Sequence, residues 1–342
     1  MLNQIHSYIV LLLILILPIN FLYAEDNNIQ YFTAKETPSP KYMPGLWVKQ
    51  NSPTQNDLKK VFFLNVAEGW AVGENGTILH TTNGGKLWTQ IDSNVEENLN
   101  AVYFVNKEIG YIIGEKGLIL KTIDNGKEWN KIRTNYMHDL NDLYFTDEKK
   151  GWIVGNYGIV LMTDDGGISW SKEIAGTQSD LIACSFIDAR QGWMIGTIGT
   201  VRSTENGGKS YNTIKITSTN YLNDIFFVDK LTGWIVGNNS EILKTNDEGK
   251  TWQKQEIPEL ENLKGVFSFN KDIGWIVGEK GLVLKTEDGG SNWGIQKTPT
   301  EENINSIYII DTTTGYAVGE KGLILRLWES DDAFQATQPP KE

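Results

Sequence analysis

The peptide Gly151-Trp152-Ile153-Val154-Gly155 decides the fold, because close copies of it recur along the chain at a constant spacing. Each copy has a glycine, then Trp or Tyr, an apolar residue, Val or Ile, and a second glycine. The copies begin at Gly69, Gly110, Gly151, Gly192, Gly233, Gly274 and Gly315, so each starts 41 residues after the one before it. Seven copies without an insertion or deletion indicate a protein built from one repeated unit.

Four short segments with the composition of β-strands follow one another within each repeat. In the second repeat they are Leu99–Phe104, Tyr111–Ile113, Leu118–Lys121 and Trp129–Ile132. Between the second and third segments, Glu115-Lys116-Gly117 reads as a tight hairpin turn in which glycine can take a positive φ. The spacing predicts one up-and-down antiparallel sheet of four strands per repeat.

Each predicted sheet is apolar on both faces, so it needs a neighbouring sheet on either side. Four strands in a period of about 40 residues are typical of a β-propeller blade. No segment shows the period of about 3.6 residues that a helical repeat requires. We therefore predict an all-β fold, a seven-bladed β-propeller with four-stranded antiparallel blades, spanning residues 46–328.

An aromatic residue near the fourth strand predicts how the ring closes. It recurs at Trp88, Trp129, Trp170, Tyr211, Trp252 and Trp293. One interval before Trp88 lies Trp47, whereas one interval after Trp293 lies Phe334, in a polar tail. The last repeat thus lacks a fourth strand of its own, and Leu46–Lys49 is predicted to complete blade seven.

The two ends of the chain differ in composition from the repeats. Residues 9–22 are apolar apart from Asn20 and lead to Ala24, which predicts a signal peptide over residues 1–24, cleaved after Ala24. An uncleaved anchor is the alternative. Residues 25–45 contain three prolines and are expected to form an extended arm, and residues 329–342 a disordered tail. We expect an exported protein, either periplasmic or secreted.

Composition argues against several classes of function. The chain has 31 basic and 43 acidic residues, a net charge of −12, with no basic stripe of the kind that binds nucleic acid. Its one cysteine, Cys184, excludes a disulfide within the chain and is expected to be a small buried apolar residue. Three histidines without a ligand cluster argue against a metal site, and nothing indicates a cofactor. We expect a monomer.

A second motif, Thr-x-(Asp/Asn)-x-Gly-x-x-aromatic, joins the third and fourth strands. Its carboxylate or amide can accept backbone N–H groups, and its glycine can take the left-handed conformation. The pattern resembles the Asp-box, or BNR repeat, and is expected to be structural. The Asp-box residues are Asn83, Asp124, Asp165, Asn206, Asp247 and Asp288.

Together, the two motifs and the sevenfold count resemble a narrower family, the photosystem II stability/assembly factor propellers of cyanobacteria and plastids and their bacterial relatives. The resemblance covers about Leu46 to Leu327. It implies an exported, non-enzymatic protein, in the thylakoid lumen if the organism is photosynthetic, that holds a membrane-protein precursor during assembly. Photosynthetic members carry an arginine patch on one face, whereas this chain has four arginines spread over repeats two, four and seven. No client-binding residue is therefore inferred from the resemblance.

The fourth repeat departs most from the common pattern. Arg202 stands where the other six repeats have leucine, and Ile182, Ser185 and Tyr211 also differ from their counterparts. A cation at a leucine position requires a partner or an open cavity. One interpretation is a buried ion pair or an arginine that reaches the surface. The other is an anion-contacting arginine at the wall of an axial cavity.

One face of the ring should gather the loops before each first strand and the hairpins between strands two and three. Asp139, Asp180 and Tyr221 belong to the loops, whereas Tyr157 and Ile198 lie in hairpins where other repeats have Asn or Lys. The Asp residues could cap turns or form a polar ring that contacts a partner. Exposed Tyr157 and Ile198 could mark a docking patch.

Taken together, these patterns favour an exported scaffold or assembly factor that binds a protein client, with a membrane protein complex as the expected partner. No catalytic residue is assigned. A sialidase-like glycoside hydrolase is the first alternative, but it needs arginines that converge on the axis. A carbohydrate-binding propeller is the second, and exposed Tyr157 and Tyr221 would serve it.

Overall fold

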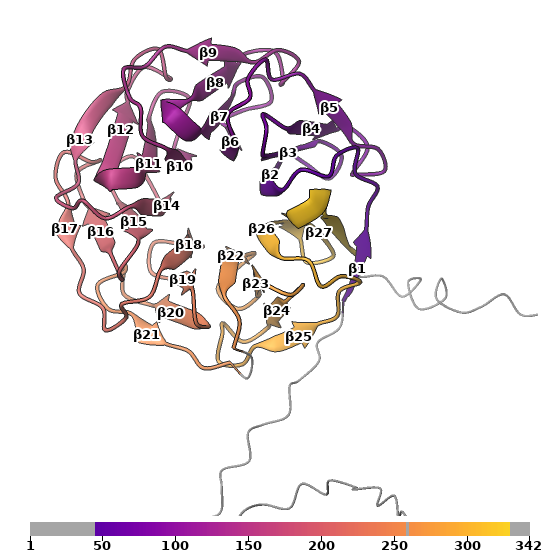
Figure 1. The fold of residues 1–342 in the computed structure, drawn as a ribbon. Coiled ribbons are helices and arrows are strands. Elements are labelled where there is room, and N and C mark those ends of the chain that lie inside the picture. Colours follow the sequence, from indigo (N-terminus) through magenta and orange to yellow (C-terminus); the bar gives the residue numbers. More distant parts are fainter. Residues whose placement is uncertain (1–44, 258–259, 329–342) are drawn as a thin grey trace, which may run out of the picture. The chain divides into compact units, whose positions relative to one another are not determined.

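The computed structural model describes residues 45–257 and 260–328, and over these residues the chain forms seven four-stranded antiparallel sheets in a ring (Figure 1). The first strand of each blade lies nearest the axis, and the fourth lies at the rim. This is the predicted seven-bladed β-propeller. The strands of blades one to three are β2 (Leu58–Phe63), β3 (Gly69–Gly73), β4 (Ile78–Thr81) and β5 (Thr89–Ile91); β6 (Leu99–Phe104), β7 (Gly110–Gly114), β8 (Ile119–Thr122) and β9 (Asn130–Ile132); and β10 (Leu140–Phe145), β11 (Gly151–Gly155), β12 (Ile159–Thr163) and β13 (Ser171–Ile174).

Blades four to seven follow the same order. Their strands are β14 (Leu181–Phe186), β15 (Gly192–Gly196), β16 (Val201–Thr204) and β17 (Asn212–Thr213); β18 (Leu222–Phe227), β19 (Gly233–Gly237), β20 (Glu241–Thr245) and β21 (Gln253–Lys254); β22 (Leu263–Ser268), β23 (Gly274–Gly278), β24 (Val283–Thr286) and β25 (Gly294–Gln296); and β26 (Ile304–Asp311), β27 (Thr314–Gly319), β28 (Ile324–Trp328) and β1 (Leu46–Lys49). Three hairpins contain short 3-10 turns, namely η1 (Glu115–Gly117), η2 (Asn156–Gly158) and η3 (Glu320–Gly322).

Blade seven closes the ring as predicted. Strand β1 pairs antiparallel with β28, and Trp47 lies opposite Leu327. Trp47 is 1% exposed, and its indole Nε1–H donates to Gln296 Oε1 at 3.0 Å, in the neighbouring blade six. The N-terminal strand therefore locks the last blade, and no blade of the ring is left with an open side.

The repeated Gly-aromatic peptide forms the second strand of each blade, and every residue of it is buried. In five of the seven blades its ring stacks on the phenylalanine near the end of the next blade's first strand. Trp152, for example, lies 3.8 Å from Phe186, centroid to centroid. The first glycine makes room for that contact, because a Cβ on Gly192 would lie 2.2 Å from the Phe186 ring. The motif is thus explained by packing between blades.

The Thr-x-(Asp/Asn)-x-Gly turns lie between the third and fourth strands, toward the rim. In blade three, Thr163 Oγ1 donates to Asp165 Oδ1 at 2.8 Å and accepts from Gly167 N–H, also at 2.8 Å. Asp165 Oδ1 accepts a further bond from Ser169 N–H at 2.9 Å, and Ser169 Oγ donates to Oδ2 at 2.6 Å. The bonds from Ser169 and Thr163 stabilise the charged carboxylate and lower the pKa of Asp165 to about 2. The fourth strand starts just after the turn aromatic, as at Asn130 after Trp129.

The predicted signal peptide, arm and tail fall on residues 1–44 and 329–342, outside the described residues. In the part of the chain that the structure describes, no helix is long and apolar enough to cross a membrane.

Candidate binding face and axial channel

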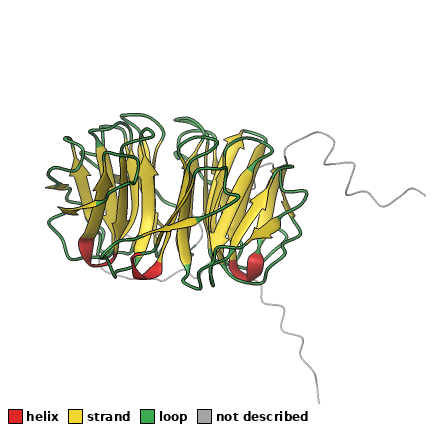
Figure 2. Ribbon diagram, turned by 90° about the horizontal axis from the view of Figure 1, so that it is seen from above, coloured by secondary structure: helices red, strands yellow, loops and turns green. Residues whose placement is uncertain are grey.

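Hairpins between strands two and three gather on one side of the ring, where Figure 2 shows all three 3-10 turns. Each hairpin contains a non-glycine residue with positive φ, and in six of the seven blades its N–H is capped by an Asp or Asn of the next blade. Lys116 N–H donates to Asp139 Oδ1 at 3.0 Å, and Tyr157 N–H donates to Asp180 Oδ1 at 2.8 Å. Asp139 and Asp180 therefore cap turns, the first of the two roles that their sequence positions suggest.

The capping fails at one boundary, between blades four and five. Tyr221 replaces the Asp or Asn there, and its neighbour Asn220 accepts the N–H of Gly199, which follows Ile198. Ile198 has a φ of 56°, a conformation that is strained for a β-branched residue. Tyr157, Ile198 and Tyr221 are 68%, 70% and 54% exposed. We call these three residues the hairpin patch; its side chains replace the Asn, Asp or Lys that the other blades present at these positions.

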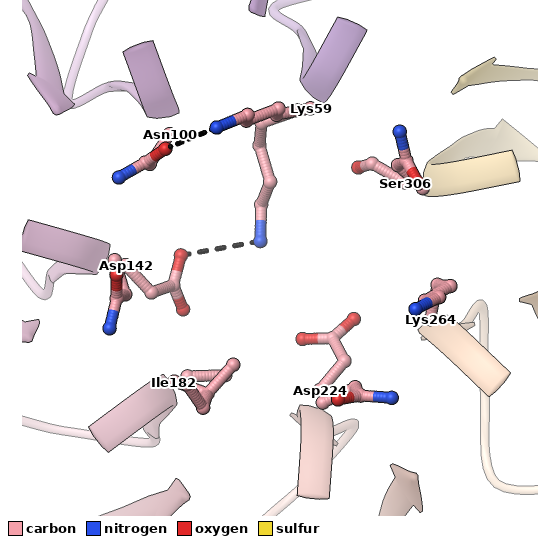
Figure 3. A pocket seen from close by; sticks show the side chains of 12 residues that line it. Lys59, Asn100, Asp142, Ile182, Asp224, Lys264 and Ser306 are labelled. Carbon is pink, nitrogen blue, oxygen red and sulfur yellow. Dashed lines mark hydrogen bonds and ion pairs between the residues drawn. The ribbon is translucent and has the colours of Figure 1, made fainter. Parts of the chain in front are cut away.

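A funnel opens on the axis, lined by the second residue of each first strand (Figure 3). Asparagine side chains here tie adjacent blades together: Asn141 Nδ2–H donates to Leu181 O at 2.7 Å, and Asn223 Nδ2–H donates to Leu263 O at 2.6 Å. Each acceptor carbonyl lies at a β-bulge at the start of the next blade. Ile182 of blade four takes this position with a side chain that cannot donate. The seven residues are Lys59, Asn100, Asn141, Ile182, Asn223, Lys264 and Asn305.

The funnel has a volume of about 220 Å³, and besides Lys59 and Lys264 its charged residues are Lys60, Asp142 and Asp224. Lys60 Nζ lies 3.2 Å from Asp142 Oδ1, and the other oxygen of Asp142 accepts from Cys184 N–H at 3.1 Å. Asp224 faces the same space (Figure 3) and accepts backbone N–H bonds from Ile225 at 3.0 Å and Val266 at 2.9 Å. It makes no ion pair with any described residue.

Burial and the charges of neighbouring groups shift the pKa values of Asp224 and Lys60. Burial is the main cause that raises the pKa of Asp224 to about 6; the charge of Lys60 opposes the rise, and that of Asp142 adds to it. For Lys60, burial disfavours the charge, but the attraction of Asp142 and Asp224 outweighs burial and raises the pKa above its ordinary value. The funnel thus holds one paired and one unpaired carboxylate.

Aromatic side chains line the channel next to the charged residues, one from the fifth position of the first strand in six of the seven blades. Their ring centroids form an unbroken series, with Phe226–Phe267 at 4.7 Å, Phe267–Tyr308 at 5.2 Å, Tyr308–Phe62 at 5.2 Å, Phe62–Tyr103 at 5.4 Å and Tyr103–Tyr144 at 5.6 Å. Burial raises the pKa of Tyr308 to about 12. We call these six residues the axial collar. Ser185 holds the seventh position, between Tyr144 and Phe226.

Arg202 lies away from this channel, which corrects the interpretation of an axial anion site. It is on β16, the third strand of blade four, and its guanidinium donates to Thr213 Oγ1 on β17 and to the carbonyl oxygen of Gly176 in blade three. Neither partner is a carboxylate, so no ion pair forms there. Neutral oxygens in the outer half of the blade accept from both terminal nitrogens of the arginine, whereas its Nε–H has no partner among the described residues.

Sequence reasoning missed the funnel and the collar. Lys60, Asp142 and Asp224 occupy one column of the repeat, where the other blades have Ala, Gly or Ser. Reading the first strands column by column would have revealed this mixture of charged and small residues. Among the described residues, no group of three or more His, Cys, Asp or Glu side chains is arranged to hold a metal ion.

Comparisons with known proteins agree with the repeat pattern. A family model described as "Photosynthesis system II assembly factor YCF48" matches residues 40–137, 133–219 and 209–301. No curated protein sequence matches.

Several solved structures share the fold. One of YCF48 bound to a D1 peptide has a TM-score of 0.72 at 20% identity, covering 87% of this chain and 100% of that one. YCF48 from Cyanidioschyzon merolae has a TM-score of 0.72 at 18% identity, with 83% and 99% covered. A xyloglucanase from Xanthomonas campestris has a TM-score of 0.68 at 10% identity, with 82% and 53% covered.

Proposed function

Because this chain belongs to the photosynthesis system II assembly factor YCF48 family, we propose that it is a non-catalytic assembly factor that holds a peptide segment of a membrane-protein client. The hairpin patch is the observation that carries this proposal. Tyr157, Ile198 and Tyr221 break a polar pattern that the other blades keep, and Ile198 keeps a strained backbone while exposing an apolar side chain. Exposed aromatic and apolar residues in one place are the usual anchors of a protein interface.

A non-catalytic role fits the way the axial carboxylates are used. A glycoside hydrolase needs two carboxyl groups free to reach the scissile bond. Here one oxygen of Asp142 faces Lys60 and the other accepts the Cys184 amide, while both oxygens of Asp224 accept backbone amides. We expect no turnover of a panel of aryl glycosides and xyloglucan; measurable hydrolysis that Asp142→Asn abolishes would contradict this part of the proposal.

Export is the second part of the proposal, supported by the apolar segment at residues 9–22 and the Ala24 site. Mass spectrometry of the chain made in its own cells is expected to find a mature N-terminus at Glu25. A chain that keeps residues 1–24 would favour an anchor instead.

Peptide binding tests the client proposal. A relative has been solved with a D1 peptide, so overlapping fluorescent peptides of D1 are the first probe, read by anisotropy. The test variant is Tyr157→Asn/Ile198→Asn/Tyr221→Asn, which gives each position the residue found in other blades. We expect it to bind at least about tenfold more weakly, because truncating buried anchors removes most of the affinity at such surfaces.

A matched control uses the same hairpin position in three other blades, Lys116→Asn/Lys280→Asn/Lys321→Asn. Asparagine tolerates positive φ, and other blades already have asparagine at the position of Tyr221, so neither triple variant should unfold. The control is expected to bind within about twofold of the unmodified chain. Equal losses in both variants, or no loss in the first, would contradict the assignment of the client to the hairpin patch.

A further inference from the structure

The axial collar is a ring with one segment missing. Six blades place Phe or Tyr at this position, and consecutive centroids lie between 4.7 and 5.6 Å apart from Phe226 round to Tyr144. Blade four places Ser185 there, and its short side chain leaves Tyr144 and Phe226 without a ring between them. Its hydroxyl oxygen accepts the Phe227 N–H at 3.3 Å, so the serine fits the fold without filling the gap.

The space inside the collar has the size of one aromatic ring. Its volume is about 120 Å³, and Tyr144, Cys184, Ser185 and Phe226 are among the residues that line it. A cavity of about 150 Å³ lined by apolar side chains takes up benzene. The wall offers ring faces and edges, which favour a further aromatic group over an aliphatic one.

The collar space adjoins the funnel, because Lys60, Asp142, Asp224 and Ser306 line both. Ile182 at the mouth and Ser185 at the gap belong to the same strand, β14. Blade four also carries Ile198 of the hairpin patch. Blade four therefore differs from the other blades at positions that extend from the outer face, at Ile198, to the axis, at Ile182 and Ser185.

We propose that this gap takes an aromatic side chain of the client's bound peptide, which would stand as the seventh ring of the collar. The inference rests on the proposed function and adds the chemistry of the anchoring residue. The client's ring would pass Lys60, whose side chain keeps 32% of its surface exposed, and lie between Tyr144 and Phe226. The peptide outside would lie over Ile182 toward the hairpin patch.

Small probes test the pocket without a client. p-Cresol, the side chain of tyrosine, is compared with 4-methylcyclohexanol, a saturated analogue, by ligand-observed NMR and by the amide shifts of Cys184 and Ser185. We expect saturable binding of p-cresol and at least tenfold weaker binding of the saturated analogue. Absence of saturable p-cresol binding, or equal binding of both probes, would overturn the proposal.

Variants at the gap give the second arm. Ser185→Phe and Ser185→Tyr supply the residue of the other blades and should weaken p-cresol binding at least tenfold, whereas Ser185→Ala keeps the gap open and should bind as the unmodified chain does. Two closing variants are used so that failure of one to fold, checked by circular dichroism and thermal melting, leaves the other. Unchanged p-cresol binding by a folded closing variant would overturn the proposal.

The experiments distinguish failure of the axial-pocket proposal from failure of the hairpin-patch proposal. If the asparagine variant of the patch binds D1 peptides normally but p-cresol binding behaves as described, only the outer docking face is wrong. If the patch variant loses peptide and Ser185→Phe keeps full affinity for the same peptide, only the axial pocket is wrong. Replacing the peptide's aromatic residue with alanine should weaken binding to the unmodified chain at least tenfold and have no further effect in Ser185→Phe.

Discussion

Aspartates and left-handed residues have opposite properties at the rim of the ring and at its axis and hairpin face. At the rim, hydrogen bonds from Ser169 and Thr163 lower the pKa of Asp165 to about 2, whereas on the axis burial raises the pKa of Asp224 to about 6. A left-handed backbone at the rim is held by Gly167 with a φ of 70°, whereas in the hairpin face Ile198 adopts a φ of 56°. The fold satisfies the Asp165 turn, whereas the axis holds a carboxylate without an ion pair among the described residues and the hairpin face holds a strained isoleucine, which is where binding energy can be found.

Exchanging the residue types of the two left-handed positions gives the largest expected effect. A Cβ on Gly167 would lie 2.8 Å from the Tyr111 ring, and a β-branched residue there would also be strained by its positive φ. Gly167→Ile is therefore expected to lower the free energy of unfolding by about 3 kcal/mol, measured by denaturant titration. A loss below about 1 kcal/mol would show that the rim turn tolerates an isoleucine at positive φ as the Ile198 hairpin does.

Removing a charge on the axis is expected to have a smaller effect, a shift in the pKa of Asp224 whose direction depends on the charge removed. Lys60 lowers and Asp142 raises the pKa of Asp224, so Lys60→Gln should raise that pKa further, and Asp142→Asn should lower it. Carbon-13 NMR of the carboxyl group measures both. An unchanged pKa of Asp224 in both variants would mean that burial alone sets the value.

The same residue fixes a dependence of stability on pH. Since the pKa of Asp224 rises from 3.8 to about 6 on folding, the folded state binds the proton more tightly, and the contribution of Asp224 falls as pH rises from about 4 to about 6. Asp165 has the opposite sign: its contribution is present above its ordinary value of 3.8 and is lost as pH falls toward about 2. In Lys60→Gln, the pH range over which the stability contribution of Asp224 falls should extend to higher pH.

Relief of backbone strain gives the smallest effect. Ile198→Asn places a residue that tolerates positive φ at a position with a φ of 56°, and should raise the free energy of unfolding by about 1 kcal/mol. Lys116→Asn, with a φ of 55° in an already capped hairpin, is the control and should change it by less than about 0.5 kcal/mol. Greater stabilisation by the control would show that the patch carries no strain.

Sequence reasoning succeeded where one residue type has one role in every repeat. The 41-residue interval predicted seven blades, and Trp47 predicted the strand that completes the last one, because burial and strand pairing demand the same residues each time. It left Arg202 between two interpretations, since the position in the repeat does not reveal that Thr213 and Gly176 offer neutral oxygens nearby. Nor could it place Asp224 beside Lys60, because the two come from blades one and five and meet only when the ring closes.

Closure by β1 also constrains how the protein can be made. Trp47 of β1 pairs with Leu327 of β28, which is almost the whole propeller further along the chain. During synthesis β1 therefore has no partner strand until the last blade has left the ribosome. Pairings between such distant segments form slowly, and exposed strand edges invite association with other chains in the meantime. Translocation of an unfolded chain, followed by closure at its destination, would shorten the period in which an incomplete ring meets its neighbours.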